Sequence, residues 1–188
     1  MTKRLFGSAL CAMLLVGFAN AANYDIDVTH SSTNFKIKHL SVSNVTGSFD
    51  KFSGIVDIEN AIPKKIDAVI NVDSINTSNT ARDNHLKQAD FFDIAKFPEM
   101  KFVMTEFKKD GDNEGKVIGN LTIKNVTKPV TLNYEFGGQS KNQKGIQIVG
   151  FSLEGKIKRS DFNFAPDTST LTLGDEIKIN IEVEAAAK

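Results

Sequence analysis

Apolar and polar residues alternate along most of this chain. The clearest run lies near the C-terminus, where isoleucine or valine at positions 177, 179, 181 and 183 alternates with lysine, asparagine and glutamate. Shorter runs with the same period occupy residues 35–39, 56–59, 67–73, 121–124 and 130–136. A period of two is typical of strands with one buried face and one solvent-facing face, the usual antiparallel arrangement.

Turn signals separate these runs at hairpin spacing. They lie where glycine, proline, asparagine or aspartate occur, at residues 60–65, 109–115, 125–129, 137–145 and 167–174. The chain shows no interdomain linker, low-complexity tract or repeat of fixed period. The pattern therefore predicts one all-β domain of roughly eight strands, folded as a sandwich or a barrel.

One stretch departs from the alternation. Residues 82–92 read RDNHLKQADFF, and Leu86 and Ala89 fall at helical spacing from Asp83. A serine and an asparagine just before the stretch are residues that cap helices, and a proline after it ends anything helical. We therefore expect one short helix of about three turns, from Ala81 to roughly Ala89.

Such a helix is too short to cover the buried face of a large sheet, so the sheet must fold onto itself. A barrel of about eight strands is near the size at which side chains fill the interior or leave room for one small ligand. Glycines inside the strand-like runs, at positions 47, 54, 119, 150 and 155, either permit sheet curvature or leave space inside. We expect the helix, with Phe91 and Phe92 behind it, to close one end of the barrel, although both rings could equally be core packing.

The N-terminus has the pattern of a secretory signal. Lys3 and Arg4 precede an apolar run at residues 5–18, and small residues follow at 19–21. This predicts a signal peptide at residues 1–21 and a single domain at residues 22–188. The apolar run is too short to span a bilayer, and the only cysteine lies within it, so the mature chain has no disulfide. We expect export to a bacterial periplasm, or secretion.

Composition and motifs exclude several function classes. The chain carries 23 basic and 23 acidic residues without a long charge run, which argues against a nucleic-acid partner and a polybasic membrane dock. Its three histidines, His30, His39 and His85, have no metal-motif spacing. No nucleophile elbow or phosphate-binding glycine loop occurs. We therefore expect no catalytic residues, no metal, no cofactor and no membrane span.

Two charged residues open the expected helix. The first hypothesis is a latch, in which Arg82 pairs with Asp83, Asp73 or Asp161 and fixes the helix over the barrel mouth. The second is that the guanidinium binds a ligand head group, because it suits phosphate or carboxylate. The third is a solvated surface pair that contributes little. His39 shares a strand face with apolar residues, so it is a further polar group expected inside.

Several segments together resemble the YceI-like family, in the family's order and over nearly the whole mature chain. They are HSSTNFKIKHL (30–40), VTGSFDKFSG (45–54), DSINT (73–77), RDNHLKQADFFD (82–93), GNLTIKNVTKPVTL (119–132), RSDF (159–162) and GDEIKINIEVEA (174–185). The resemblance implies a lipocalin-like antiparallel β-barrel with an apolar tunnel. It implies a long-chain amphiphile as ligand, namely a polyisoprenoid, an isoprenoid quinone or a fatty-acid amide. It also implies an exported protein of a family whose members are often periplasmic and often dimeric, so a homodimer is one expected form.

The combined expectation is a periplasmic carrier that holds such a lipid by burial of its tail. Two alternatives stay open: an accessory of a quinone- or lipid-modifying redox enzyme, and an interaction protein with a solid barrel and no ligand. We place Phe102 and Met104 on the inner face of their strand. Alternation alone would equally allow the other face, which carries Val103 and Phe107, to be the inner one. The candidate tunnel residues are Phe35, Ile37, Phe49, Phe52, Val56, Ile70, Val72, Leu86, Phe91, Phe92, Phe102, Met104, Leu121, Leu132, Phe151, Ile179 and Ile181, with His39, Arg82 and Asp83 as polar latch or head-group residues.

Overall fold

The computed structural model describes residues 23–188, so the predicted signal peptide at residues 1–21 lies outside the described residues. The described chain is almost entirely β-structure with one short α-helix and three single turns of 3-10 helix. In chain order the elements are β1 (Asn23–Ile26), η1 (Val28–His30), β2 (Ser32–His39), β3 (Ser43–Phe49), β4 (Phe52–Glu59), β5 (Ile62–Asn71), η2 (Val72–Ser74), β6 (Ile75–Asn76), α1 (Thr80–Leu86), β7 (Glu99–Lys109), β8 (Glu114–Ile123), β9 (Val126–Lys141), β10 (Gln147–Lys158), η3 (Arg159–Phe162) and β11 (Leu173–Ala187).

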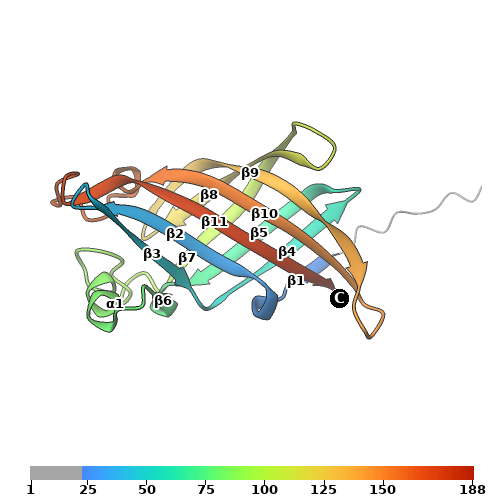
Figure 1. Ribbon diagram of the computed structural model, residues 1–188, viewed down its shortest axis with the longest axis horizontal. Coiled ribbons are helices and arrows are strands. Elements are labelled where there is room, and N and C mark those ends of the chain that lie inside the picture. Colours follow the sequence, from blue (N-terminus) through green and yellow to red (C-terminus); the bar gives the residue numbers. More distant parts are fainter. Residues whose placement is uncertain (1–22) are drawn as a thin grey trace, which may run out of the picture.

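Eight of the strands form a closed antiparallel ring. Their order is β1-β4-β5-β7-β8-β9-β10-β11, and pairing between β1 and β11 completes the circle. Figure 1 shows the long, strongly tilted strands of this barrel, with α1 beside one of its ends. The structure confirms the predicted all-β barrel of about eight strands with one short helix.

The strand β11 has two partners along the same edge. Its C-terminal residues 185–187 pair with β1, whereas residues 173–182 pair with β2. β2 continues to β3, and β3 pairs with β6 only through Ser48–Asn76 and Phe49–Ile75. Strand pairing therefore closes the barrel where β1 lies, and α1 with the connector to β7 contributes to the interior wall at the other end. We call these the β1 end and the helix end.

The helix is shorter than predicted. It spans Thr80–Leu86, about two turns, and the Asn79 side chain caps it by accepting a backbone N–H of the first turn. The chain then turns, and the backbone N–H of Phe92 donates to the carbonyl of Leu86 at 3.0 Å. Successive helical residues point about 100° apart, whereas this turn lets both Phe91 and Phe92 face the interior. No helix among residues 23–188 has the length and apolarity needed to cross a bilayer.

Strand β7 changes register within its length. Phe102 and Met104 face the interior, as predicted, and Val103 faces solvent. A bulge just after Met104 then shifts the pairing with β8. Phe107 consequently returns to the interior, where its ring lies 5.5 Å from that of Tyr134. The prediction that Phe107 shares a face with Val103 is wrong, because strict alternation ends at the bulge.

Aromatic rings fill the space that strand glycines leave. Phe35 lies opposite Gly47, and a Cβ on that glycine would come within 2.5 Å of the Phe35 ring. The ring of Phe102 covers Gly119 in the same way. These glycines therefore do not create a hollow by themselves; they allow two large rings to lie flat against the barrel wall.

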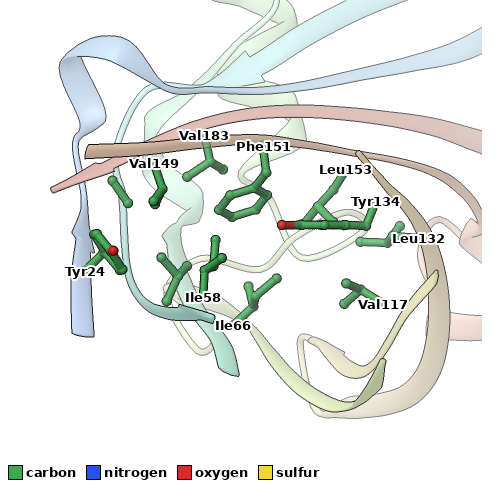
Figure 2. Close-up of a cluster of buried hydrophobic side chains, with 12 residues drawn as sticks. Tyr24, Ile58, Ile66, Val117, Leu132, Tyr134, Val149, Phe151, Leu153 and Val183 are labelled. Carbon is green, nitrogen blue, oxygen red and sulfur yellow. The ribbon is translucent and has the colours of Figure 1, made fainter. Parts of the chain in front are cut away.

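The interior at the β1 end is closely packed, although Ile26, Ile66 and Val183 of this end also border the cavity described below. Buried side chains pack around Tyr134 and Phe151, whose ring centroids lie 5.5 Å apart, as Figure 2 shows. Val56 and Val117 are completely buried there. The Tyr134 hydroxyl donates to the carbonyl of Ala61 at 3.1 Å, and burial raises the pKa of Tyr134 above its ordinary value. Close packing therefore seals this end of the barrel.

Candidate functional site

The interior at the helix end encloses a cavity of about 540 Å³. Small-molecule sites in proteins usually have volumes of about 300–1,000 Å³. The wall consists of inward-facing side chains from every strand of the barrel and from β2, β3 and β6, joined by α1, its connector, η3 and the loop before β11. Most of these side chains are apolar, and at the inner end the wall reaches Phe151 and Leu132 of the packed core. An apolar guest with one extended chain would meet hydrocarbon on nearly every side.

Most of the predicted tunnel residues lie on this wall. The strands place them there through their alternation, because every second side chain of each strand faces the interior. The predicted residues on the wall are Phe35, Ile37, Phe49, Phe52, Ile70, Leu86, Phe91, Phe92, Phe102, Leu121, Leu132, Phe151, Ile179 and Ile181, together with the polar His39 and Arg82.

Three predicted tunnel residues do not line the cavity. Val56 is completely buried in the packed core of the β1 end. Met104 faces the interior but packs against that same core. Val72 lies in η2, not in a strand, and is buried in the apolar cluster behind the wall. Alternation gave the correct side of the sheet for Val56 and Met104 but not their position along the barrel.

A chain of aromatic contacts runs along the cavity wall at the helix end. The ring of Phe35 lies 5.7 Å from Phe49, and Phe49 lies 5.9 Å from Phe92. Phe164, from the loop before β11, lies 4.6 Å from Phe92 and 5.5 Å from Phe91. The tilted and edge-to-face geometries are those that aromatic pairs favour. Phe91 and Phe92 are therefore core packing and cavity wall at once.

Arg82 and Asp83 both bind Thr77, and this differs from each predicted ion pair. The Arg82 Nε donates to the Thr77 hydroxyl at 2.8 Å, and its Nη2 donates to the Thr77 carbonyl at 2.8 Å. Asp83 accepts the backbone N–H of Thr77 at 2.9 Å and its hydroxyl at 2.5 Å. The predicted partners of Arg82, namely Asp83, Asp73 and Asp161, are therefore wrong. Thr77 is buried, so the helix is tied to the chain preceding it by hydrogen bonds.

Two ion pairs lie beside α1. Lys87, at the C-terminus of the helix, binds Asp73 of η2 at 2.8 Å, and this hydrogen bond lowers the pKa of Asp73. His85 binds Asp90 at 2.9 Å, and both side chains are mostly exposed yet contribute to the cavity lining. His85 therefore lies at the rim, as expected, and Asp90 is a rim residue that the sequence did not single out.

Arg159 is the main site residue that the sequence did not reveal. It is buried at the start of η3 and lines the cavity. Its Nη1 donates to the carbonyls of Phe164 and Ala165 at 3.1 and 2.6 Å. Its Nη2 donates to Thr168 and Leu173 at 2.5 and 3.2 Å. One guanidinium thus organises the loop between β10 and β11, whereas arginine in a sequence is ordinarily read as a surface residue.

Among the described residues, one side-chain cluster has the composition of a metal site. Asp27, His30 and Glu184 bring ligand atoms within 4.8 Å of one another, and none of them lines the cavity. His30 Nδ1 lies 3.0 Å from Asp27 and 3.7 Å from Glu184. The hydrogen bond to Asp27 raises the pKa of His30, which is the behaviour of an ion-paired imidazole. Charge pairing therefore accounts for this cluster.

Comparison with known proteins agrees with this geometry. Two proteins named Protein YceI, from Salmonella newport and Salmonella arizonae, are each 41% identical over 187 residues, covering 97% of both chains. The crystal structure of a Campylobacter jejuni YceI protein is 50% identical with a TM-score of 0.76, covering 81% of this chain and 91% of that one. Burkholderia cenocepacia BcnA is 25% identical with a TM-score of 0.75, covering 85% and 98%.

A more distant structure shares the fold alone. The Saccharophagus degradans domain, described as polyisoprenoid-binding, is 18% identical with a TM-score of 0.67, covering 88% of this chain and 98% of its own. The family description that matches this chain is the YceI-like domain, over residues 24–185, which is nearly the whole described barrel. The resemblance predicted from the sequence is confirmed, and the chain belongs to the YceI-like family.

Proposed function

We propose that this protein is a periplasmic carrier that holds a long-chain amphiphilic lipid, with the lipid's apolar tail in the barrel cavity. The observation that carries the proposal is the cavity of about 540 Å³ at the helix end, walled almost wholly by apolar side chains. A solid barrel would leave no place for a tail, so the cavity counts against the alternative of an interaction protein without ligand.

The ligand class is a polyisoprenoid, an isoprenoid quinone or a fatty-acid amide. The distant fold relative described as a polyisoprenoid-binding domain supports this class. Burial of hydrocarbon contributes about 0.8 kcal/mol per methylene, so a tail of roughly twenty carbons offers ~16 kcal/mol before the costs of ordering and association. Affinity would thus follow tail length, and the few polar groups on the wall would discriminate weakly between head groups.

Binding rather than turnover fits the polar groups of the cavity. His39 and Arg82 come from different parts of the wall, and Arg82 already donates to Thr77. Asp90 is held by His85 at the rim. Arg82 and Asp90 are thus engaged with the protein itself, and neither arrangement is a nucleophile with a base within hydrogen-bond reach.

The test is native mass spectrometry of the exported protein, followed by organic extraction. We expect a co-purifying lipid of defined mass, and the same spectra report whether the carrier is a homodimer, as the family resemblance implies. The variant Ile37→Trp places a large ring on the cavity wall and should lose the lipid while the circular dichroism spectrum stays that of a β-barrel. The control Ile146→Trp changes an exposed residue of the β9–β10 hairpin and should keep it. Recovery of no lipid from the wild type, or equal recovery from a folded Ile37→Trp, would refute the proposal.

A further inference from the structure

Three exposed apolar side chains gather at one point of the helix end. Leu40 and Val42, in the turn between β2 and β3, are 54% and 80% exposed, and Leu171, in the loop before β11, is 74% exposed. They are the most exposed large hydrophobic residues of the chain from residue 23 to residue 188; the next three are only 39–48% exposed and lie elsewhere. We call Leu40, Val42 and Leu171 the apolar tip.

Hydrogen bonds between the two segments hold the apolar tip together. The backbone N–H of Leu40 donates to the Thr172 carbonyl at 2.8 Å, and the Ser41 hydroxyl donates to the Leu171 carbonyl at 3.3 Å. Figure 1 shows the β2–β3 turn and the loop before β11 side by side at one extremity of the barrel. The tip is therefore a single surface built from two parts of the sequence.

The backbone of the tip is costly for the residues that occupy it. Leu40 and Ser41 have φ angles of 49° and 59°, in the left-handed region. Glycine or asparagine enters this region cheaply, whereas a bulky side chain there is uncommon. A leucine that is both strained and more than half exposed contributes little to folding, which points to a role for its side chain outside the fold.

The tip adjoins the cavity rim. His39, which immediately precedes Leu40, lines the cavity. Thr172 and Leu173, which follow Leu171, line it as well. Anything that covers the tip would therefore lie next to this part of the cavity wall.

The tip is also free of charge. Residues 40–49 (LSVSNVTGSF) and 168–174 (TSTLTLG) contain no charged side chain, although 24% of the whole chain is charged. Apolar side chains can be buried at the boundary between the head groups and acyl chains of a bilayer, and binding strength scales with the apolar area buried there. The charged residues nearest in the sequence to the three apolar side chains, Lys38, Asp167 and Asp175, lie outside these two segments, so these side chains have only uncharged neighbours within them.

We propose that the apolar tip inserts into the surface of a lipid bilayer and so brings the cavity rim against the membrane. The inference rests on the proposed function in one respect, that the bilayer is the source or the acceptor of the lipid carried in the cavity. Docking follows from apolar burial and not from charge, so it does not depend on anionic lipid. This separates it from the polybasic mode of membrane attachment.

The experiment is co-sedimentation of the full mature chain with vesicles of phosphatidylcholine alone and of phosphatidylcholine with phosphatidylglycerol. Binding to the two vesicle types should agree within about twofold and should change little between about 0.05 and 0.5 M salt, because screening acts only on charge. The double variant Val42→Thr, Leu171→Asn should weaken vesicle partitioning by roughly tenfold or more, because two apolar side chains leave the hydrocarbon boundary. The control Val103→Thr, an exposed valine on β7, should leave it unchanged.

One further variant separates docking from folding. Leu40→Asn suits the left-handed backbone better than leucine, so it should unfold at an equal or higher urea concentration while binding vesicles more weakly. The inference is overturned if the tip variants bind like the wild type. It is also overturned if binding requires phosphatidylglycerol and disappears in salt, or if the tip variants instead abolish self-association measured without vesicles. Lipid extraction is scored separately, so a protein that docks through the tip but carries no lipid refutes the proposed function alone.

Discussion

The two ends of the barrel are built from the same alternating strands but held together differently. At the β1 end, apolar side chains such as Val56 and Tyr134 fill the interior, and strand pairing closes the ring. At the helix end, the interior keeps a cavity, and hydrogen bonds from Arg159 and to Thr77 fix the segments around it. The β1 end is stabilised mainly by packing, whereas the helix end combines a packed apolar wall with polar contacts around a cavity.

The difference shows how a barrel can be stable and still hold a guest. A cavity lowers stability because its lining side chains lack contacts on one side. The closely packed β1 end supplies contacts that the helix end lacks, and the hydrogen bonds of Arg159 and Thr77 hold the segments around the cavity in place. Substitutions at the two ends should therefore lower the free energy of unfolding by different amounts and for different physical reasons.

The largest effect is expected from removal of the Arg159 guanidinium. Arg159→Met keeps much of the side-chain volume but removes the donors to the carbonyls of Phe164 and Thr168. The buried carbonyl of Ala165 loses its Arg159 donor and keeps only the backbone N–H of Thr168. We expect the free energy of unfolding in urea to fall by roughly 3–5 kcal/mol, because unsatisfied buried polar groups cost free energy. Arg159→Lys should recover only part of this loss, since an ammonium cannot reach as many carbonyls. A cost below about 1 kcal/mol for Arg159→Met would show that the helix end does not depend on this residue.

A matched pair of isoleucines compares the two ends directly. Ile58 and Ile37 are both 7% exposed, but Ile58 belongs to the packed core whereas Ile37 faces the cavity. Ile58→Ala should cost about 3 kcal/mol, as for isoleucine in a close-packed interior. Ile37→Ala should cost clearly less, about 1–2 kcal/mol, because its side chain already borders empty space. Urea unfolding of both variants measures the difference, and equal costs would mean that the cavity wall is packed as tightly as the core.

Alternation predicted a sheet closed as a sandwich or a barrel and much of its inner wall, and the family resemblance added the choice of a barrel. Phe35 and Ile37 on β2, and Ile179 and Ile181 on β11, face the interior because period two fixes the side of the sheet once the strand is fixed. The same rule could not locate the cavity along the barrel. Val56 obeys the pattern as well as Ile179 does, and whether a position is filled depends on the side chains across the barrel.

The remaining site features depend on contacts between distant segments. The sequence around Phe107 does not predict the bulge that returns this side chain to the interior. Thr77 binds both Arg82 and Asp83 because the chain bends at Ser78, between β6 and α1. In the sequence, the adjacent opposite charges suggested an ion pair instead. Arg159 is buried because carbonyl groups of a loop converge on it. The residue types in that loop do not predict this convergence.

The smallest effects are expected from pH, and they should have opposite signs at the two ends. At the helix end, the hydrogen bond and charge of Lys87 lower the pKa of Asp73 from its ordinary value of 3.8. That ion pair therefore stabilises the fold above pH 3.8, and its contribution is lost as the pH falls through the lowered pKa. At the β1 end, the hydrogen bond to Asp27 raises the pKa of His30 from 6.5. The contribution of the His30–Asp27 pair to stability is complete below pH 6.5 and is lost as the pH rises through the raised pKa of His30.

Two variants read these contributions separately. The difference in urea midpoint between the wild type and Asp73→Asn should be small, and it should shrink as the pH falls from about 5 toward about 2. The difference between the wild type and His30→Gln should shrink in the other direction, as the pH rises from about 5 to about 8. Both pairs are exposed to solvent, so high salt should reduce both differences. The contradicting outcome is that the two differences in urea midpoint change in the same direction with pH. A general change in net charge would then explain both, and the two ion pairs would not distinguish one end of the barrel from the other.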